Sequence, residues 1–200
     1  MDGYGTFDVF AWLLKLMSEI TGQGAPALKN NKLYRMLLAG IFLAVAVVLP
    51  VITGQIPQIG NALCPMHIPV ILAGFFTGPW YAAAIGLAAP LLRFLISGVP
   101  VLVPKGIAMC LELSAYGMVT GLLYRTFPRK KIYIYVTLVC AMLAGRIVWG
   151  AARVVFFGLG GYEFGWAAFM AGAFLNAIPG IVIQLVAIPV LVIALQRYTN

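Results

Sequence analysis

Charged and aromatic side chains recur at helical spacing in two otherwise apolar stretches of the chain. In one stretch Arg146, Trp149 and Arg153 stand at i, i+3 and i+7, so they share one face of a helix. The other stretch carries Lys105, Met109, Glu112 and Tyr116 at i, i+4, i+7 and i+11. A guanidinium binds a carboxylate through two parallel hydrogen bonds, and an indole covers an apolar or ring portion of a ligand. The two faces predict a cavity for a small solute with a carboxylate or another electronegative group.

The same residues also have a structural interpretation. Glu112 could pair with an arginine to hold two helices together, while Lys105 and Arg153 extend outward to the membrane surface. One carboxylate does not neutralise a lysine and three arginines, of which Arg93 and Arg146 are the others. The surplus positive charge favours a ligand cavity, and the structural interpretation stays open beside it.

Two further polar positions interrupt apolar sequence. His67 begins an apolar stretch directly after a polar loop, and a lone histidine there is either a hydrogen-bonded helix-start residue or a ligand contact. Asn176 precedes Pro179 and Gly180, a combination that exposes backbone groups. Hydrocarbon tolerates such exposure only where protein or a cavity supplies partners. For Asn176 an interhelical hydrogen bond is the structural alternative.

Composition indicates a membrane protein. Of the 200 residues, 63% are hydrophobic and 9% are charged, whereas an average soluble domain has about 25% charged residues. The mean hydropathy is +1.02. The 13 Lys and Arg exceed the 5 Asp and Glu, and in so apolar a chain this excess faces anionic lipid headgroups rather than nucleic acid. We therefore predict an all-α integral membrane protein.

Missing motifs exclude several function classes. The sequence has neither a GxxxxGK[ST] phosphate loop nor an HExxH motif, and it contains one histidine, so ATP hydrolysis and a histidine-rich metal site are not expected. Its 3 cysteines form no C-x-x-C pair and are interpreted as small buried side chains. No nucleophile with a nearby base points to catalysis. We predict no metal, no cofactor and no enzymatic activity.

The apolar segments predict six membrane-spanning helices. They are expected at residues 36–53, 105–124, 132–157 and 168–195 and, as a pair divided at Gly78 and Pro79, within 65–96. Residues 7–20 are too short and too charged to span, and their apolar spacing predicts an amphipathic helix on the membrane surface. No signal peptide is expected, because Asp2 and Asp8 occupy its positive region. The predicted organisation is an amphipathic segment over 1–30 and a six-helix membrane domain over 31–200.

Charge distribution orients these helices. Basic residues are concentrated at 29–35 and 125–131, whereas the loops at 54–64, 98–104 and 158–164 contain no Lys or Arg. Two crossings within 65–96 put both basic segments on the same side of the membrane, and a single crossing would separate them. We therefore predict two crossings there, with both termini in the cytoplasm.

The pattern of helices resembles the substrate-binding S components of energy-coupling factor (ECF) vitamin transporters. The resemblance covers about residues 33–196 and depends on HIPVILAGFFTGP at 67–79, GPWYAAAIGLAAPL at 78–91 and the small residues of the first helix. It implies a vitamin receptor of the bacterial cell membrane that docks on a transmembrane coupling protein driven by two cytoplasmic ATPases. The HIPVI sequence is most similar to pantothenate-type members.

The resemblance also implies residue roles. The family's docking motif, Ala-x-x-x-Ala, falls here on Gly40 and Ala44, and the glycine departs from it while still permitting close helix packing. The family's ligand site is built by the loop after the first helix and by the outer halves of the last three helices. With His67, the candidate substrate-binding residues are Asn61, Lys105, Glu112, Arg146, Trp149, Arg153 and Asn176.

Two other function classes remain as alternatives. One is an autonomous ion-coupled carrier or channel for small solutes, and the other is a membrane enzyme with its site in the outer cavity. The scarcity of acidic residues and histidine argues against proton coupling. Transport by the purified protein without ATPase partners would favour the carrier.

Overall fold

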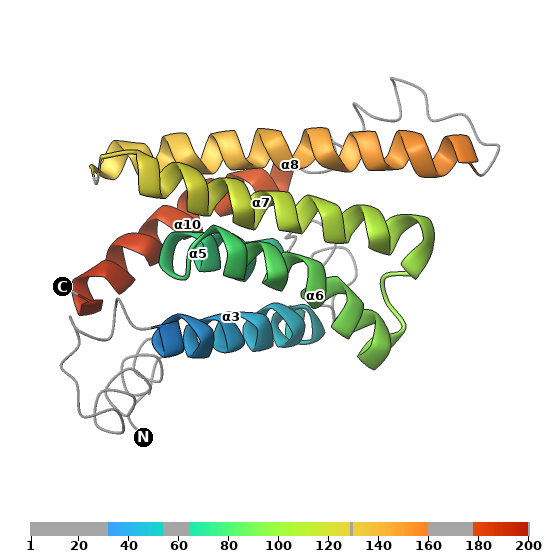
Figure 1. The fold of residues 1–200 in the computed structure, drawn as a ribbon, viewed down its shortest axis with the longest axis horizontal. Coiled ribbons are helices and arrows are strands. Elements are labelled where there is room, and N and C mark those ends of the chain that lie inside the picture. The colour runs from blue at the N-terminus through green and yellow to red at the C-terminus, as the bar shows by residue number, and fades with distance from the viewer. Residues whose placement is uncertain (1–31, 54–64, 129, 160–177, 200) are drawn as a thin grey trace.

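The computed structural model describes residues 32–53, 65–128, 130–159 and 178–199, and all regular structure in these ranges is helical. The elements are α3 (Lys32–Thr53), α5 (His67–Phe76), α6 (Pro79–Ser97), the short helical turn η1 (Leu102–Gly106), α7 (Ile107–Thr126), α8 (Lys131–Leu159) and α10 (Ile178–Thr199). Figure 1 shows the long helices lying side by side as a bundle. The amphipathic segment expected before residue 31 lies outside the described residues.

Length and hydropathy separate the helices into two groups. Four described segments are long and apolar enough to cross a membrane: Lys32–Val51, Pro79–Ser97, Ile107–Thr126 and Lys131–Phe156. The 10 residues of α5 rise about 15 Å, half of a hydrocarbon core of about 30 Å. The chain is thus a multi-helix membrane protein, and the number of six crossings stays a prediction.

The predicted division between α5 and α6 is confirmed. The Thr77 amide and hydroxyl both donate to the Ala73 carbonyl oxygen, which closes α5, and Gly78 then adopts a φ of 99°. Only glycine adopts such a conformation without steric cost. Pro79 starts α6, where its missing N–H has no intrahelical acceptor to lose. The Arg125 guanidinium occupies the space that a Cβ at Gly78 would need.

Helix α7 packs against α6 at backbone contact. A Cβ at Gly117 would lie 2.6 Å from the Ala82 carbonyl oxygen, and one at Gly121 would lie 2.5 Å from the Pro79 nitrogen. On the other helix, a Cβ at Gly86 would lie 2.5 Å from the Leu113 backbone. These glycines let the two helices approach closely, and their order shows that α6 and α7 run antiparallel.

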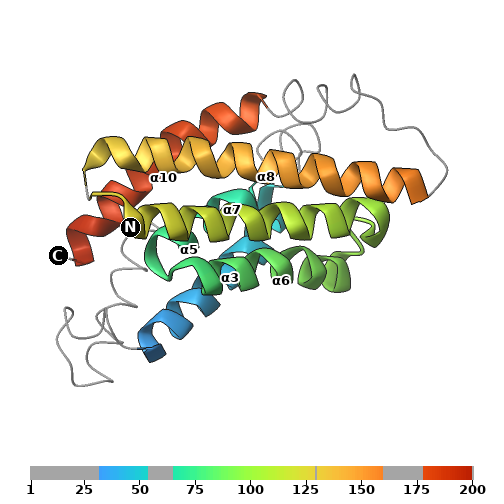
Figure 2. The ribbon, with the colours of Figure 1, turned by 45° about the horizontal axis from the view of Figure 1, so that its top comes forward.

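The remaining contacts show that successive helices alternate in direction. Along α5 and α7 they advance together, with Gly74 against Thr120 and the Phe75 ring 4.8 Å from that of Tyr124, so these two helices are parallel. Helix α8 returns antiparallel to α7, and Gln196 of α10 donates to the Tyr124 hydroxyl. The Phe42 ring of α3 stacks on that of Phe76 at 6.3 Å. Figure 2 shows α10 crossing beside α8.

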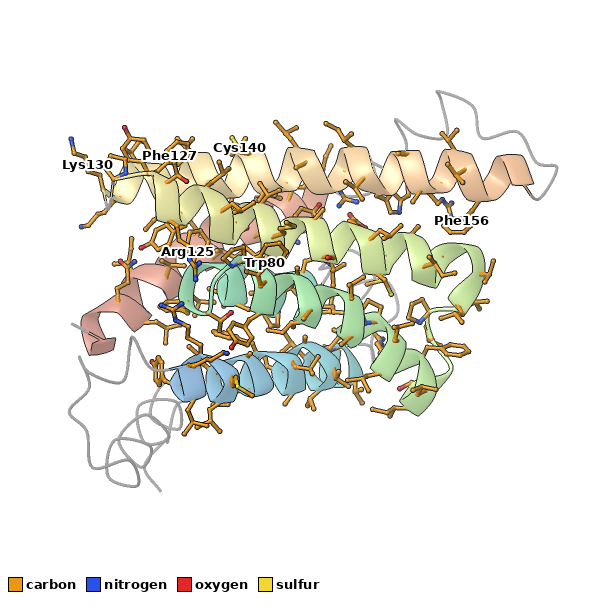
Figure 3. The ribbon with its side chains drawn as sticks, in the orientation of Figure 1. Trp80, Arg125, Phe127, Lys130, Cys140 and Phe156 are labelled. Carbon is orange, nitrogen blue, oxygen red and sulfur yellow. The ribbon has the colours of Figure 1, made fainter. Side chains whose placement is uncertain are left out.

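The alternation gathers basic residues at one end of the bundle. The start of α3, the α7–α8 connection and the end of α10 lie together at the left of Figure 1. Arg125 and Lys130 are labelled at this end in Figure 3, whereas Phe156 lies toward the far end of α8. The described parts of the two basic segments therefore lie at the same end of the bundle, which agrees with the predicted alternation of the helices. Which end faces the cytoplasm stays a prediction.

The core lies between the helices and is formed mainly by α5, α7 and the facing sides of α3, α6, α8 and α10. Its largest fully buried apolar members are Leu38, Met66, Val70, Ile71, Leu113, Tyr116, Leu138, Ile188 and Val192. Burying a large apolar side chain stabilises a fold by about 1.5 to 3 kcal/mol when the alternative is exposure to water. In a membrane the alternative is lipid, so close packing of the side chains holds these helices together instead. The outward faces are apolar, as contact with lipid requires.

Candidate functional site

A buried carboxylate joins three helices. Glu112 of α7 is 3% exposed, and its Oε1 lies 3.0 Å from Nη1 of Arg146 on α8. The same oxygen lies 3.7 Å from Nε2 of His67, the first residue of α5. An isolated charge in hydrocarbon costs at least about 2.5 to 3.5 kcal/mol, so a carboxylate at this depth requires a cationic partner. We call His67, Glu112 and Arg146 the Glu112 cluster.

Helix directions place these residues at one level. Because α8 is antiparallel to α7, Arg146 comes back beside Glu112, and the residue before it, Gly145, lies against the Tyr116 ring. Because α5 is parallel to α7, its first residue lies beside the first half of α7. His67 is 4% exposed and Arg146 9% exposed, so the Glu112 cluster is buried in the core.

One aromatic ring contacts the cluster, and a second lies on α8 three residues beyond Arg146. The His67 and Tyr116 rings make an edge-to-face contact, with centroids 5.3 Å apart and planes at 69°. On α8, the Arg153 guanidinium carbon lies 5.4 Å from the centroid of the Trp149 ring. This is a cation–π contact, which holds a guanidinium while its N–H groups stay directed elsewhere. An indole and a guanidinium together suit a ligand with an apolar part and an electronegative part.

A second group of cations lies nearer the end of the bundle opposite the basic loops. Arg153 is seven residues beyond Arg146, which is about 10 Å along α8. Helix α6 runs antiparallel to α7, and its Gly86 lies against Leu113, next to Glu112. Arg93 is seven residues beyond Gly86 and therefore lies toward the same end as Arg153. Both arginines are half-buried, and Lys105 is exposed in η1 at the same end. The described helices thus carry Arg146 beside Glu112 at depth and further basic side chains toward this end.

The structure brings some predicted site residues together and separates others. His67, Glu112 and Arg146 form the cluster, and Trp149 pairs with Arg153. Lys105 is not part of the cluster. It lies in η1, before α7 begins at Ile107, and the backbone of η1 is extended at Val103, so Lys105 does not continue the face of α7 that carries Glu112. Asn61 and Asn176 lie outside the described residues. The structural interpretation of Glu112 is thus correct for its pairing with arginine, although the sequence did not indicate the contact with His67.

Tyr116 lies on the polar face predicted for residues 105–116, but it was not among the candidate substrate-binding residues. This residue is 1% exposed and contacts His67. Its spacing of four residues from Glu112 placed it on the face, whereas the contact with His67 depends on the packing of α5 against α7. Gln184 of α10 is a buried polar side chain, 2% exposed, that was also not among the candidates. Within the described ranges, no three His, Cys, Asp or Glu side chains gather as a metal ion would require.

The docking residues predicted on α3 face outward. Gly40 and Ala44 are both exposed, and nothing within 4 Å would meet a Cβ at Gly40. They share this outward face with the exposed side chains of Met36, Val48 and Val51. Within the described structure, no helix therefore packs against Gly40 and Ala44.

Comparison with known proteins gives one match. The model of the family described as "ECF transporter, substrate-specific component" matches residues 34–192. No curated protein and no solved structure matches significantly. The matched range includes the Glu112 cluster, the Arg153–Trp149 pair and the outward face of α3. Since it covers most of the chain, the chain belongs to the family of substrate-specific components of ECF transporters.

Proposed function

We propose that the chain is the high-affinity substrate-binding subunit of an ECF-type ABC transporter that takes up a vitamin or a related micronutrient. Family membership makes it a membrane-embedded transport protein that binds a small molecule, rather than an enzyme, and that works with coupling and ATPase subunits. An autonomous ion-coupled carrier is not favoured by that membership. We further propose that the protein lies in a bacterial cell membrane with both termini in the cytoplasm.

The observation that supports the ligand chemistry is the pairing of Glu112. This carboxylate is the only acidic side chain of the described residues, and it already lies 3.0 Å from Arg146. Three further cations lie toward the end of the bundle opposite the basic loops: Arg93, Lys105 and Arg153. This excess of basic over acidic side chains on the described helices, together with the contact of Arg153 with Trp149, supports a ligand with a carboxylate or another electronegative group near Arg153 and an apolar or ring portion against Trp149. Pantothenate is a ligand of this kind.

The test begins with identification of the small molecule that co-purifies with the protein, by mass spectrometry. Arg153→Ala is expected to weaken its binding by roughly ten- to hundredfold, since a charge-assisted hydrogen bond contributes about 1.5 to 3 kcal/mol. Arg153→Lys keeps the charge but loses the planar fork, so we expect a smaller loss. Lys131→Ala, exposed at the opposite end of α8, is the matched control. Parent-like binding by a folded Arg153→Ala protein would contradict the anionic-ligand proposal.

The proposed orientation has its own test. In a background without native cysteines, Lys130→Cys should react only with membrane-permeant reagents in intact cells, because it lies in the basic connection between α7 and α8. Ser97→Cys, at the end of α6, should react with impermeant reagents. The reverse labelling would contradict cytoplasmic termini.

The outward face of α3 is the proposed contact with the coupling protein. Small residues four apart let a second helix approach closely, and Gly40 and Ala44 are exposed with that spacing. Reconstitution separates this role from independent transport. Vesicles with the purified chain alone should accumulate no vitamin, whereas vesicles that also contain the coupling protein and ATPases should do so on ATP addition. Uptake by the chain alone would support the carrier alternative.

A further inference from the structure

The orientation of the His67 ring is not held by hydrogen bonds within the described structure. The side chain is buried, and neither Nδ1 nor Nε2 has a hydrogen-bond partner among the described residues. The 3.7 Å between Nε2 and Glu112 Oε1 is longer than a hydrogen bond. A buried imidazole normally has its ring orientation set by a hydrogen bond to one of its nitrogens. Among the described residues, packing against neighbouring side chains is what sets the orientation of this ring.

The Tyr116 ring is in position to do so. Its centroid lies 5.3 Å from that of His67, with planes at 69°, and edge-to-face packing of this kind is favoured for aromatic pairs. Tyr116 follows Glu112 by four residues on α7, so one face of one helix presents both the carboxylate and the ring. At 1% exposure, Tyr116 is packed on all sides and has little room to move.

The Tyr116 ring also lies against Gly145 of α8, where a side chain would leave it no room. A Cβ at Gly145 would lie 2.9 Å from both Cε1 and Cζ of Tyr116, closer than carbon atoms pack. Gly145 directly precedes Arg146, the partner of Glu112. The same turn of α8 therefore supplies the guanidinium for Glu112 and the space for Tyr116.

We propose that Tyr116 is a positioning residue that holds the His67 imidazole toward Glu112, and that Gly145 provides the space this requires. In this arrangement neither imidazole nitrogen has a hydrogen-bond partner among the described residues, so a ligand that reaches the buried cluster can hydrogen-bond to either. The relevance to uptake depends on the proposed function, since it requires that His67 contacts the substrate. The positioning of the ring does not depend on it.

The test uses the chain's single histidine, which gives one set of imidazole NMR signals after histidine-selective isotope labelling. The full-length protein is measured in detergent without added ligand. We expect one narrow signal set for the parent and for Tyr116→Phe, because phenylalanine keeps the ring. Tyr116→Leu and Gly145→Ala should split or broaden the set, because the imidazole then samples more than one orientation. Ala151→Val, at an exposed position of α8, is the control and should match the parent.

A single narrow set in both Tyr116→Leu and Gly145→Ala would overturn the proposal. If these variants do not fold, the parent provides a second measurement, a through-space cross-peak between His67 and a labelled tyrosine ring. That cross-peak should vanish in Tyr116→Phe, where the labelled ring is lost, and its absence from the parent would also overturn the proposal. Neither result involves a ligand, so loss of the positioning role and loss of the anionic-ligand proposal are separate outcomes.

Discussion

Small residues four apart occur on α7 and on α3, and their surroundings differ: the pair on α7 is covered by another helix, whereas the pair on α3 is exposed. On α7, Gly117 and Gly121 lie against the backbone of α6, where a Cβ at either would come within 2.6 Å of Ala82 or Pro79. On α3, Gly40 and Ala44 have the same spacing and are exposed, with nothing within 4 Å of the Cβ position at Gly40. The first pair is covered by α6, and no described helix covers the second.

This difference shows what the small-xxx-small pattern does and does not specify. Small side chains permit close helix approach, but they do not determine which helix approaches. In α7 the partner is α6, which precedes it in the chain and runs antiparallel to it. In α3 no described helix covers the pair, which fits the proposed contact with a coupling protein. Substitutions of the small residues on α7 and on α3 should therefore differ in their effects.

The largest effect is expected for Gly117→Val. Its side chain would meet the backbone of Ala82, which cannot move without separating α6 from α7, so we expect a loss of about 3 kcal/mol or more in unfolding free energy. Unfolding in mixed detergent micelles measures this loss. The matched variant Gly40→Val should remain folded, because its side chain enters open space. Equal stabilities of the two variants would contradict the close contact of α6 with α7.

The next effect concerns transport rather than folding. Gly40→Leu or Ala44→Leu should abolish uptake in cells that contain the full transporter, because a bulky side chain would block approach of a second helix. Binding of the co-purifying vitamin by the isolated variant should stay close to that of the parent. Val45→Leu, exposed on a neighbouring part of α3, is the control for uptake. Loss of binding together with uptake would place this face in the ligand site or the fold.

A smaller effect is expected when one methyl group is added at the buried contact between α6 and α7. Gly86→Ala places a Cβ 2.5 Å from the Leu113 backbone, so we expect destabilisation by about 1 to 3 kcal/mol. Detergent unfolding of the purified variant would measure it. A value indistinguishable from the parent would mean that α6 shifts to accommodate the methyl group.

The smallest effect should have the opposite sign. Gly40→Ala adds the same methyl group where nothing lies within 4 Å, and alanine favours the helix over glycine by roughly 0.5 to 1 kcal/mol. We expect slightly higher stability in the same unfolding assay, with vitamin binding unchanged. Destabilisation by Gly40→Ala would show that this position is packed and would remove the contrast between α3 and α7.

Several features of the fold and site could be predicted from local sequence. The break between α5 and α6 follows from Gly78 and Pro79, because positive φ and a missing N–H act within a few residues. The pairing of Glu112 with an arginine follows from the cost of a lone carboxylate in an apolar helix. The basic segments meet at one end because the predicted helices alternate in direction. Each of these depends on properties of single residues or single helices.

The contacts across helices could not be predicted in this way. His67 and Glu112 are 45 positions apart, and their approach depends on the level at which α5 packs along the parallel α7. The position of the Tyr116 ring depends on Gly145 of a third helix. The sequence alone determined that the chain is helical and membrane-embedded, because hydropathy and segment length are sums over neighbouring residues. Only the tertiary structure decided which glycines are covered and which remain exposed, because small side chains permit an interface and the packing of the remaining helices selects it.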